Sequence, residues 1–231
     1  MSQLKAKMFL GDQRGCTETE QFRRYCTFNF ENYYNENKSA FGNLAVLNDE
    51  TLAGGYSAEF TTRDSYYVLL LPVAGSLLCN INDSEISLVH PGQMAFLKIL
   101  KNNHFVLTNS YKSELINFIQ VWVKTDDNAR RLKPEQFSFD IEERKNELIQ
   151  ITPQPGISVT ASIGMFDGRK KAACFSRNMQ SSLFAFVISG VFEVEHRLLH
   201  AGDGLALWNG INNIEMEALS NNAILFLLEL E

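Results

Sequence analysis

Apolar and polar residues alternate with a period of two along much of the chain. The alternation is clear in residues 157–163, 192–195 and 214–218, where apolar side chains take every second position. A period of two buries one face of a β-strand and leaves the other face in solvent. Clusters of Asn, Asp, Ser, Gly and Lys separate these runs, as is typical of turns. Many short strands with regular turns predict an all-β fold of the sandwich or barrel type.

Residues 125–150 interrupt this rhythm, because they are rich in charge and contain Pro134. Proline cannot donate to a strand ladder, and charged side chains are unfavourable in a buried strand. We therefore interpret this stretch as a connection between two domains, in which residues 141–146 could form a short helix.

An internal repeat supports two similar domains. Residues 88–93 (LVHPGQ) recur as residues 198–203 (LLHAGD), and an apolar strand follows each copy. Upstream of each copy an apolar strand ends at a glycine, Gly75 in the first and Gly190 in the second. Glycine suits such turns because it adopts positive φ without strain. Two tandem small β-barrels explain the repeat, since closure of a barrel removes exposed strand edges.

Composition narrows the function only slightly. The 231 residues include 21 Lys+Arg and 27 Asp+Glu, for a formal net charge of −6. Proteins that bind nucleic acid without regard to sequence need a basic surface, so we expect no direct nucleic-acid binding. The N-terminal residues do not resemble a secretory signal, and no apolar run is long enough to span a bilayer. We expect a cytoplasmic protein without a membrane contact.

The cysteines and histidines limit the possible metal chemistry. The four cysteines are Cys16, Cys26, Cys79 and Cys174, and none has the C-x-x-C spacing of a zinc or redox site. We interpret them as thiols of the kind commonly buried in cores. The chain has only four histidines, which limits any imidazole-rich site.

Several segments resemble the pirin family of bicupins. Residues 26–34 (CTFNFENYY) and 41–49 (FGNLAVLND) are similar to the opening signature of that family, and residues 12–16 look like its short Arg-Gly motif. Residues 118–123 (FIQVWV) and 203–208 (DGLALW) are similar to two of its later strands. Cys16 and Cys26 stand where the family has histidines. The resemblance covers nearly the whole chain and agrees with the repeat.

The resemblance implies two cupin barrels, which are double-stranded β-helices. We place the N-terminal cupin domain at residues 1–124, the connector at 125–147 and the C-terminal cupin domain at 148–231. It also implies one metal, held in the N-terminal barrel by three histidines and one glutamate. Some pirin-like proteins oxidise the flavonol quercetin with dioxygen, and others bind transcription regulators.

The first pair of ligand histidines has no counterpart here. When Arg63 and the aspartate after it are aligned with the family motif, the histidine positions fall on Phe60 and Thr62. Alignment on Gly75 instead puts Thr61 and Arg63 there. Neither alignment supplies an imidazole.

The second strand keeps at most one ligand. An ungapped count puts Phe105 and Leu107 at the histidine and glutamate positions, and a one-residue gap puts His104 and Val106 there. A borderline divalent ion needs several convergent N, O or S donors, which one imidazole among apolar residues does not supply. We therefore expect no metal cofactor. The alternative is one divalent transition metal, either iron, nickel or manganese, in an altered site.

Polar residues near the lost site are the remaining candidates. Glu59 and His104 could form an acid–imidazole pair for general acid–base work, or they could lie outside the barrel, with Glu59 in solvent and His104 in a turn. Gln120 could orient a ligand or satisfy a backbone group. The candidate pocket lining is Glu59, Phe60, Thr62, His104, Phe118, Gln120 and Trp122.

The other histidines favour structural roles. His90 and His200 occupy equivalent positions in the repeat, just before a glycine turn. His196 lies beside Glu193 and Glu195, but these alternate with apolar residues and indicate a solvated strand face.

Three functional hypotheses follow. The leading one is a pirin-like bicupin that lacks the usual metal centre and binds a small molecule or a protein without catalysis. The alternative is a cupin dioxygenase of the quercetinase type with an altered metal site around Glu59 and His104. The third is a regulatory partner of a transcription or metabolic protein.

Overall fold

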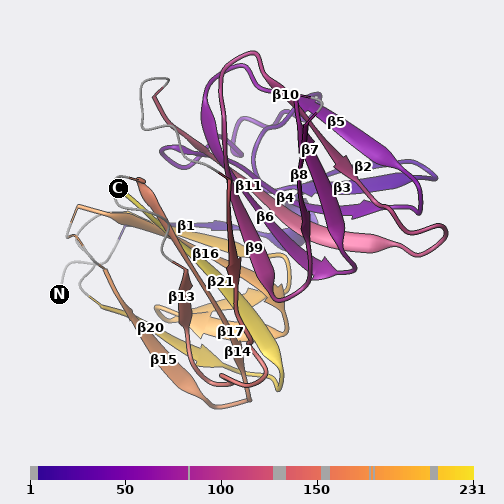
Figure 1. Ribbon diagram of the computed structural model, residues 1–231. Helices are drawn as coiled ribbons and strands as arrows, with labels where there is room; N and C mark the ends of the chain where they lie inside the picture. Colours follow the sequence, from indigo (N-terminus) through magenta and orange to yellow (C-terminus); the bar gives the residue numbers. More distant parts are fainter. Residues whose placement is uncertain are drawn as a thin grey trace. The chain divides into compact units, whose positions relative to one another are not determined.

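The structure is a computed structural model that describes residues 5–82, 84–126, 134–151, 157–176, 178, 180–208 and 213–231, with residues 84–87 described by their backbone alone. The chain divides into two compact units. The N-terminal unit is residues 15–139, and the C-terminal unit is residues 140–231 together with residues 1–14. In Figure 1 the strands of the N-terminal unit run from purple to pink and most of those of the C-terminal unit from orange to yellow.

The described residues of the N-terminal unit form eleven strands, arranged in a seven-stranded sheet of order β12-β9-β6-β11-β4-β3-β2 and a four-stranded sheet of order β5-β10-β7-β8. The strands are β2 (Gly15–Glu18), β3 (Phe22–Cys26), β4 (Leu44–Leu52), β5 (Ser57–Thr61), β6 (Tyr66–Ala74), β7 (Leu77–Ile81), β8 (Ser84–Val89), β9 (Gln93–Ile99), β10 (His104–Thr108), β11 (Ile116–Lys124) and β12 (Glu135–Ser138).

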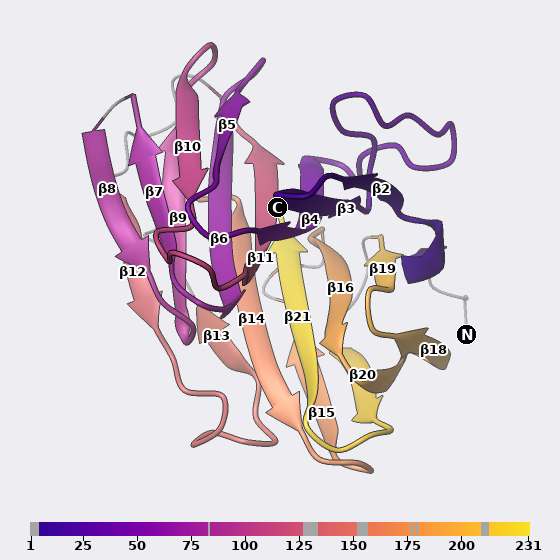
Figure 2. The same cartoon turned by 90° about the vertical axis from the view of Figure 1, so that its right-hand side faces the viewer.

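The C-terminal unit has the same plan, with a six-stranded sheet of order β1-β19-β16-β21-β14-β13 and a four-stranded sheet of order β15-β20-β17-β18. Its elements are β1 (Ala6–Phe9), a 3₁₀ turn η1 (Gly11–Gln13), β13 (Ile149–Ile151), β14 (Val159–Phe166), β15 (Lys171–Phe175), β16 (Ser182–Ser189), β17 (Val191–Val194), β18 (Arg197–His200), β19 (Gly204–Leu207), β20 (Asn213–Ala218) and β21 (Ala223–Leu230). Figure 2 shows β14, β21, β16 and β19 side by side.

The repeat predicted from the sequence is confirmed by the strand order. The series β9-β6-β11-β4 of the N-terminal unit corresponds to β19-β16-β21-β14, and β5-β10-β7-β8 corresponds to β15-β20-β17-β18. The glycines of the two copies also match, because Gly75 and Gly190 have φ of 72° and 79° and follow equivalent strands. The chain is all-β across its described residues, apart from the single 3₁₀ turn.

Each unit has its own apolar core. Residues at alternate strand positions of both sheets point inward, as the period of two requires. In the N-terminal unit the core includes Leu52, Phe60, Phe105, Phe118 and Trp122. In the C-terminal unit the core includes Phe166, Phe192 and Leu225 among its largest members.

The unit boundaries differ from the predicted domains, 1–124 and 148–231. β1 pairs with β19, with Ala6 opposite Leu207, so residues 1–14 belong to the C-terminal unit. β12 pairs with β9, so part of the predicted connector 125–147 is a strand of the N-terminal unit. Residues 127–133 of that connector lie outside the described residues.

The short helix predicted around residues 141–146 is wrong. These residues form consecutive turns, and the chain reverses at Asn146, whose φ is 69°. Asp140 Oδ1 accepts hydrogen bonds from the backbone N–H groups of Glu142 and Glu143, both at 2.9 Å, as the N-cap of a helix does. The capped segment does not extend into a helix, because the left-handed conformation at Asn146 ends it.

Candidate functional site: the interior of the N-terminal unit

The two strands that carry the metal ligands in the pirin pattern are β5 and β10, which pair antiparallel with Phe60 opposite Phe105. Burial alternates along both strands, so Phe60 and Phe105 point into the interior, where they are 2% and 0% exposed. Leu107 also points inward and is 0% exposed. The inward positions that the ungapped count assigned to metal ligands therefore hold apolar side chains.

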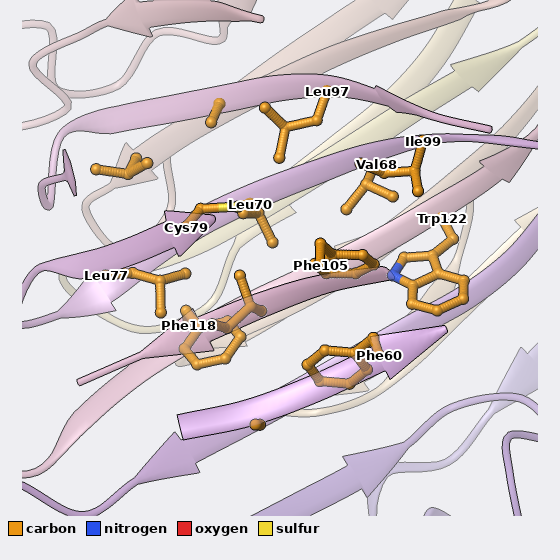
Figure 3. Close-up of a cluster of buried hydrophobic side chains, with 14 of the residues drawn as sticks. Phe60, Val68, Leu70, Leu77, Cys79, Leu97, Ile99, Phe105, Phe118 and Trp122 are labelled. Carbon is orange, nitrogen blue, oxygen red and sulfur yellow. The ribbon is translucent and has the colours of Figure 1, made fainter. Parts of the chain in front are cut away.

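Aromatic rings fill the space around these positions. Phe60 stacks on Phe105 with ring centroids 5.1 Å apart and an interplanar angle of 17°. The Trp122 ring lies 5.6 Å from the Phe105 ring and 6.2 Å from the Phe60 ring. Figure 3 shows the three rings together, with Phe118 beside them on the same strand as Trp122. Stacked and tilted pairs at these distances are favourable, so the cluster is a packed core.

Thr62, at the second histidine position, is also buried, and its hydroxyl is engaged locally. Its Oγ1 donates to the backbone carbonyl of Leu100 at 2.7 Å, with the carbonyl of Asn103 at 3.2 Å as a second acceptor. The side chain thus fixes the turn that leads into β10. This geometry gives Thr62 a structural role in the turn.

Glu59 and His104 do not line the interior, contrary to their place among the predicted lining residues. Glu59 is exposed on β5, and His104 is half-buried at the start of β10, opposite Thr61. Because their inward neighbours are Phe60 and Phe105, the pleat turns both side chains to the outer face of the sheet. They cannot form an acid–imidazole pair inside the barrel.

The remaining histidines lie in turns or in solvent. The backbone N–H groups of His90 and His200 donate to the side chains of Gln93 (3.0 Å) and Asp203 (2.8 Å), the same turn geometry in both repeats. His196 is exposed and lies 3.9 Å from Glu193. It lines an acidic surface groove of about 470 Å³ on the outer face of β17 and β20. No group of three His, Cys, Asp or Glu side chains able to hold a metal occurs among the described residues.

A buried polar cluster lies deeper in the same interior, on three neighbouring strands. Arg24 on β3 faces Glu50 on β4, and Asn48 on β4 faces Gln120 on β11. Arg24 Nε donates to Glu50 Oε1 at 2.8 Å, and the side-chain amides of Asn48 and Gln120 donate to the same oxygen at 3.3 Å. We call these four residues the Arg24–Glu50 cluster.

The cluster is strongly shielded from water. Glu50, Asn48 and Gln120 are each 0% exposed. Burial raises the pKa of the Glu50 carboxyl, against the opposing charge and hydrogen bonds of Arg24. Burial lowers the pKa of the Arg24 guanidinium, but Glu50, with smaller contributions from Glu31 and Cys26, raises this pKa overall. Burial likewise raises the pKa of the neighbouring Cys26 thiol to about 12.

Some polar atoms of this interior have no hydrogen-bond partner among the described residues. They are the side-chain carbonyl oxygens of Asn48 and Gln120 and the indole nitrogen of Trp122. Figure 3 shows that nitrogen on the side of the indole that faces Phe105. Gln120 thus orients Glu50 rather than satisfying a backbone group, and its oxygen remains a buried acceptor.

A pocket of about 250 Å³ opens beside the aromatic cluster. Phe30, Phe60, Tyr66 and Trp122 form its aromatic wall. The Trp122 ring lies 5.2 Å from Tyr66 and 5.4 Å from Phe30. The other lining residues are Asn29, Glu31, Ala45, Val46, Thr61 and Arg63. We call this cavity the aromatic pocket. The pocket therefore combines an aromatic wall with polar and charged side chains, which together could contact a small ligand.

These residues do not fit the metal that the pirin pattern implies. A transition metal needs three or more convergent donors in an open site. The inward side chains at the family positions are Phe60, Phe105 and Leu107, which offer none. The buried carboxylate of Glu50 is already bound by Arg24 and two amides.

The sequence analysis did not identify the Arg24–Glu50 cluster, although the positions of the two charged residues in the sequence indicate it. In residues 22–26 and 48–52, charged Arg24 and Glu50 take the same alternate positions as apolar Phe22 and Leu52. Opposite charges at inward positions of two predicted strands indicate a cross-strand ion pair. The signal requires the register of β3 on β4, which the sequence alone does not supply.

Comparison with known proteins supports the fold assignment. The family described as "Quercetinase C-terminal cupin domain" matches residues 159–230, within the C-terminal unit. A protein of Escherichia coli K12 named quercetin 2,3-dioxygenase is 19% identical over 202 residues, which are 86% of this chain and 87% of that protein.

Solved structures match nearly the whole chain. The E. coli protein YhhW superposes with a TM-score of 0.86 at 17% identity, covering 98% of both chains. The nickel(II) complex of bacterial pirin YhhW gives 0.83 at 16% identity, covering 98% of this chain and 99% of that one. The E. coli protein YhaK gives 0.71 at 18% identity, with 90% and 93% covered.

The shared architecture defines a bicupin, in which two cupin barrels follow each other in one chain. These structures and the family match over residues 159–230 agree with the resemblance seen in the sequence: the chain has the bicupin fold, and it is similar to pirin and quercetinase proteins. Nickel binding is a property of the YhhW complex. Among the described residues of this chain, the inward family positions lack metal donors. No helix in the described parts of the chain is long and apolar enough to cross a membrane.

Proposed function

We propose that this pirin-like bicupin is a non-enzymatic binding module that takes a small molecule in the aromatic pocket of its N-terminal unit. The observation that carries the proposal is the Phe60–Phe105 stack at the positions where the family pattern requires metal ligands. The two rings fill the interior at these positions, and Phe60 also forms part of the wall of the aromatic pocket. The site therefore retains a recognition surface while it lacks the donors for metal chemistry.

The size and lining of the pocket favour a small planar ligand. A volume of about 250 Å³ is slightly below the range of drug-sized sites. Aromatic side chains on its wall offer stacking faces for a planar ring. A protein partner remains the alternative occupant of this surface.

Ligand binding is tested with a neutral planar probe such as 2-naphthol, measured by titration calorimetry. Tyr66→Ala removes one aromatic wall and should weaken binding about tenfold, since an aromatic contact and its buried area together supply roughly 1–2 kcal/mol. Tyr34→Ala is the matched control, because Tyr34 is 79% exposed and does not line the pocket. Equal loss in both variants, or no loss in Tyr66→Ala, would contradict the assigned site.

A metal analysis distinguishes the binding module from the competing dioxygenase hypothesis. If the chain is a binding module, protein expressed in medium supplemented with iron, nickel and manganese should contain well below one tightly held transition metal per chain by elemental analysis. Oxygen uptake with quercetin should not exceed the protein-free rate, and His104→Ala should change nothing, because His104 lies on the outer face of β10. Near-stoichiometric metal with His104-dependent turnover would establish the enzyme.

A further inference from the structure

A buried guanidinium lies directly behind the aromatic pocket. The Arg24 Cζ atom is 4.8 Å from the ring centroid of Phe30 and 5.1 Å from that of Phe60, and both rings line the pocket. The Arg24 side chain itself is only 6% exposed. A cation against aromatic faces in a desolvated site is held strongly, so its charge is fixed behind the pocket wall.

Arg24 binds two carboxylates that differ in their surroundings. Glu50 is fully buried and is held by Arg24 and two amides, so it is a fixed partner. Glu31 accepts a hydrogen bond from Arg24 Nη1 at 2.6 Å, but its side chain is 52% exposed. Glu31 also lines the pocket. The second carboxylate on Arg24 is therefore accessible from the pocket.

Glu31 is presented by a tight turn. Phe30 and Tyr33 exchange backbone hydrogen bonds of 3.1 and 2.9 Å across it. Within this turn Glu31 has φ of 49°, in the left-handed region, which is unfavourable for a residue with a Cβ atom. The chain thus accepts backbone strain at the position that places this carboxylate on Arg24, a pattern that occurs at ligand sites.

A ligand carboxylate can take the place of Glu31 without a change of charge. Leaving the buried Arg24 with one partner fewer is costly, so Glu31 leaves only when another anion arrives. Guanidinium binds carboxylates in a planar, two-bond geometry, which suits an acid coplanar with an aromatic ring. Arg63, which is exposed and lines the same pocket, adds a second positive charge at its rim.

We propose that the aromatic pocket binds planar aromatic carboxylates, and that Glu31 is an internal competitor that the ligand displaces from Arg24. This inference rests on the proposed binding function and names its ligand class. The ring lies against the wall of Phe30, Phe60 and Trp122, and the ligand carboxylate takes the Nη1 side of Arg24. Glu50 keeps its place and orients the guanidinium.

The test compares benzoate with benzamide, its neutral analogue, by titration calorimetry on the full chain. Glu31→Gln removes the competing charge and keeps the shape of the side chain. It should tighten benzoate binding about fivefold or more and leave benzamide binding unchanged, as expected for the loss of one competing ion pair. Glu36→Gln is the matched control, because Glu36 is an exposed carboxylate of the same loop and does not line the pocket.

Three results would overturn the inference: unchanged or weaker benzoate binding in Glu31→Gln, an equal gain for benzamide, or an equal gain in Glu36→Gln. If 2-naphthol binding still depends on Tyr66 in any of these cases, the proposed binding function stands and only the ligand class is wrong. If neither 2-naphthol nor benzoate binds in a Tyr66-dependent way, the proposed function itself fails.

Discussion

Arg24→Met should be among the most damaging single substitutions in the N-terminal unit. Methionine keeps much of the length of the arginine side chain but removes the charge that faces Glu50, which is 0% exposed. Breaking a buried ion pair by deleting one partner typically costs about 3–5 kcal/mol, because the other charge is left uncompensated. We expect a loss of this size in the free energy of unfolding of the N-terminal unit.

The assay requires a signal confined to that unit. The chain has two tryptophans, Trp122 in the N-terminal unit and Trp208 in the C-terminal unit. Urea unfolding followed by fluorescence in a Trp208→Phe background therefore reports on the surroundings of Trp122. Arg23→Met is the matched control, because the Arg23 guanidinium is exposed and lies 4.0 Å from Glu18. Such a surface pair contributes about 0–1 kcal/mol.

The loss in Arg24→Met should also depend on pH. Burial raises the pKa of Glu50, and Arg24 is the main group that opposes this shift. Without Arg24 the folded-state pKa lies further above the unfolded value, so the protonated carboxyl stabilises the folded state at low pH. This stability is lost as the pH rises through the folded-state pKa. The deficit relative to wild type should therefore be larger at pH 8 than at pH 5.

A double variant distinguishes the cost of the uncompensated Glu50 charge from the cost of the packing lost with the arginine side chain. Arg24→Met with Glu50→Gln should recover part of the lost stability at pH 8, because the uncompensated carboxylate is gone. Its deficit should be nearly independent of pH in this range. A single variant within 1 kcal/mol of wild type, or a double variant less stable than the single one, would refute this account of the Arg24–Glu50 cluster.

Two further predictions concern the core and the thiols. Phe105→Ala should destabilise the N-terminal unit by about 3–5 kcal/mol in urea unfolding, because the ring is fully buried. Phe175→Ala is the control and should cost far less, because that side chain is 70% exposed. Equal losses in the two variants would contradict the assigned core. In the native protein, Cys16 is exposed and should react with a thiol reagent much faster than Cys26 and Cys79, whose pKa values are raised to about 12 by burial; comparable rates at the three thiols would contradict the assigned burial.

The fold was predictable because the alternation that forms its strands depends on neighbouring residues, and because the same order of strands and turns occurs twice in the chain. The two glycine turns at Gly75 and Gly190 mark equivalent points of each barrel. The short helix predicted at residues 141–146 was wrong because the chain turns into the left-handed region at Asn146, so the segment that Asp140 caps ends after its turns. The pairing of β1 with β19 was also missed, since four residues of β1 carry no information about so distant a partner.

The site was predictable only in part, because it depends on register. The missing ligands follow from sequence positions, and the structure places Phe60 and Phe105 inward as neighbours. The sequence could not show that His104 points outward, because the two possible alignments differ by one residue. A shift of one residue exchanges the inward and outward positions of a strand. The Arg24–Glu50 cluster required the pairing of β3 with β4, and the aromatic pocket required the turn at Glu31.

The position of β1 has a consequence for the order in which the chain folds during synthesis. The N-terminal unit is one continuous stretch, residues 15–139, and its strands can pair as soon as that stretch leaves the ribosome. β1 is made earlier, but its partner β19 (Gly204–Leu207) is translated last but two among the strands. β1 must therefore wait as an unpaired edge strand through the synthesis of the whole N-terminal unit. Such long-range pairing slows folding and leaves β1 open to wrong partners, so the ribosome-bound chain is most exposed to misassembly before β19 appears.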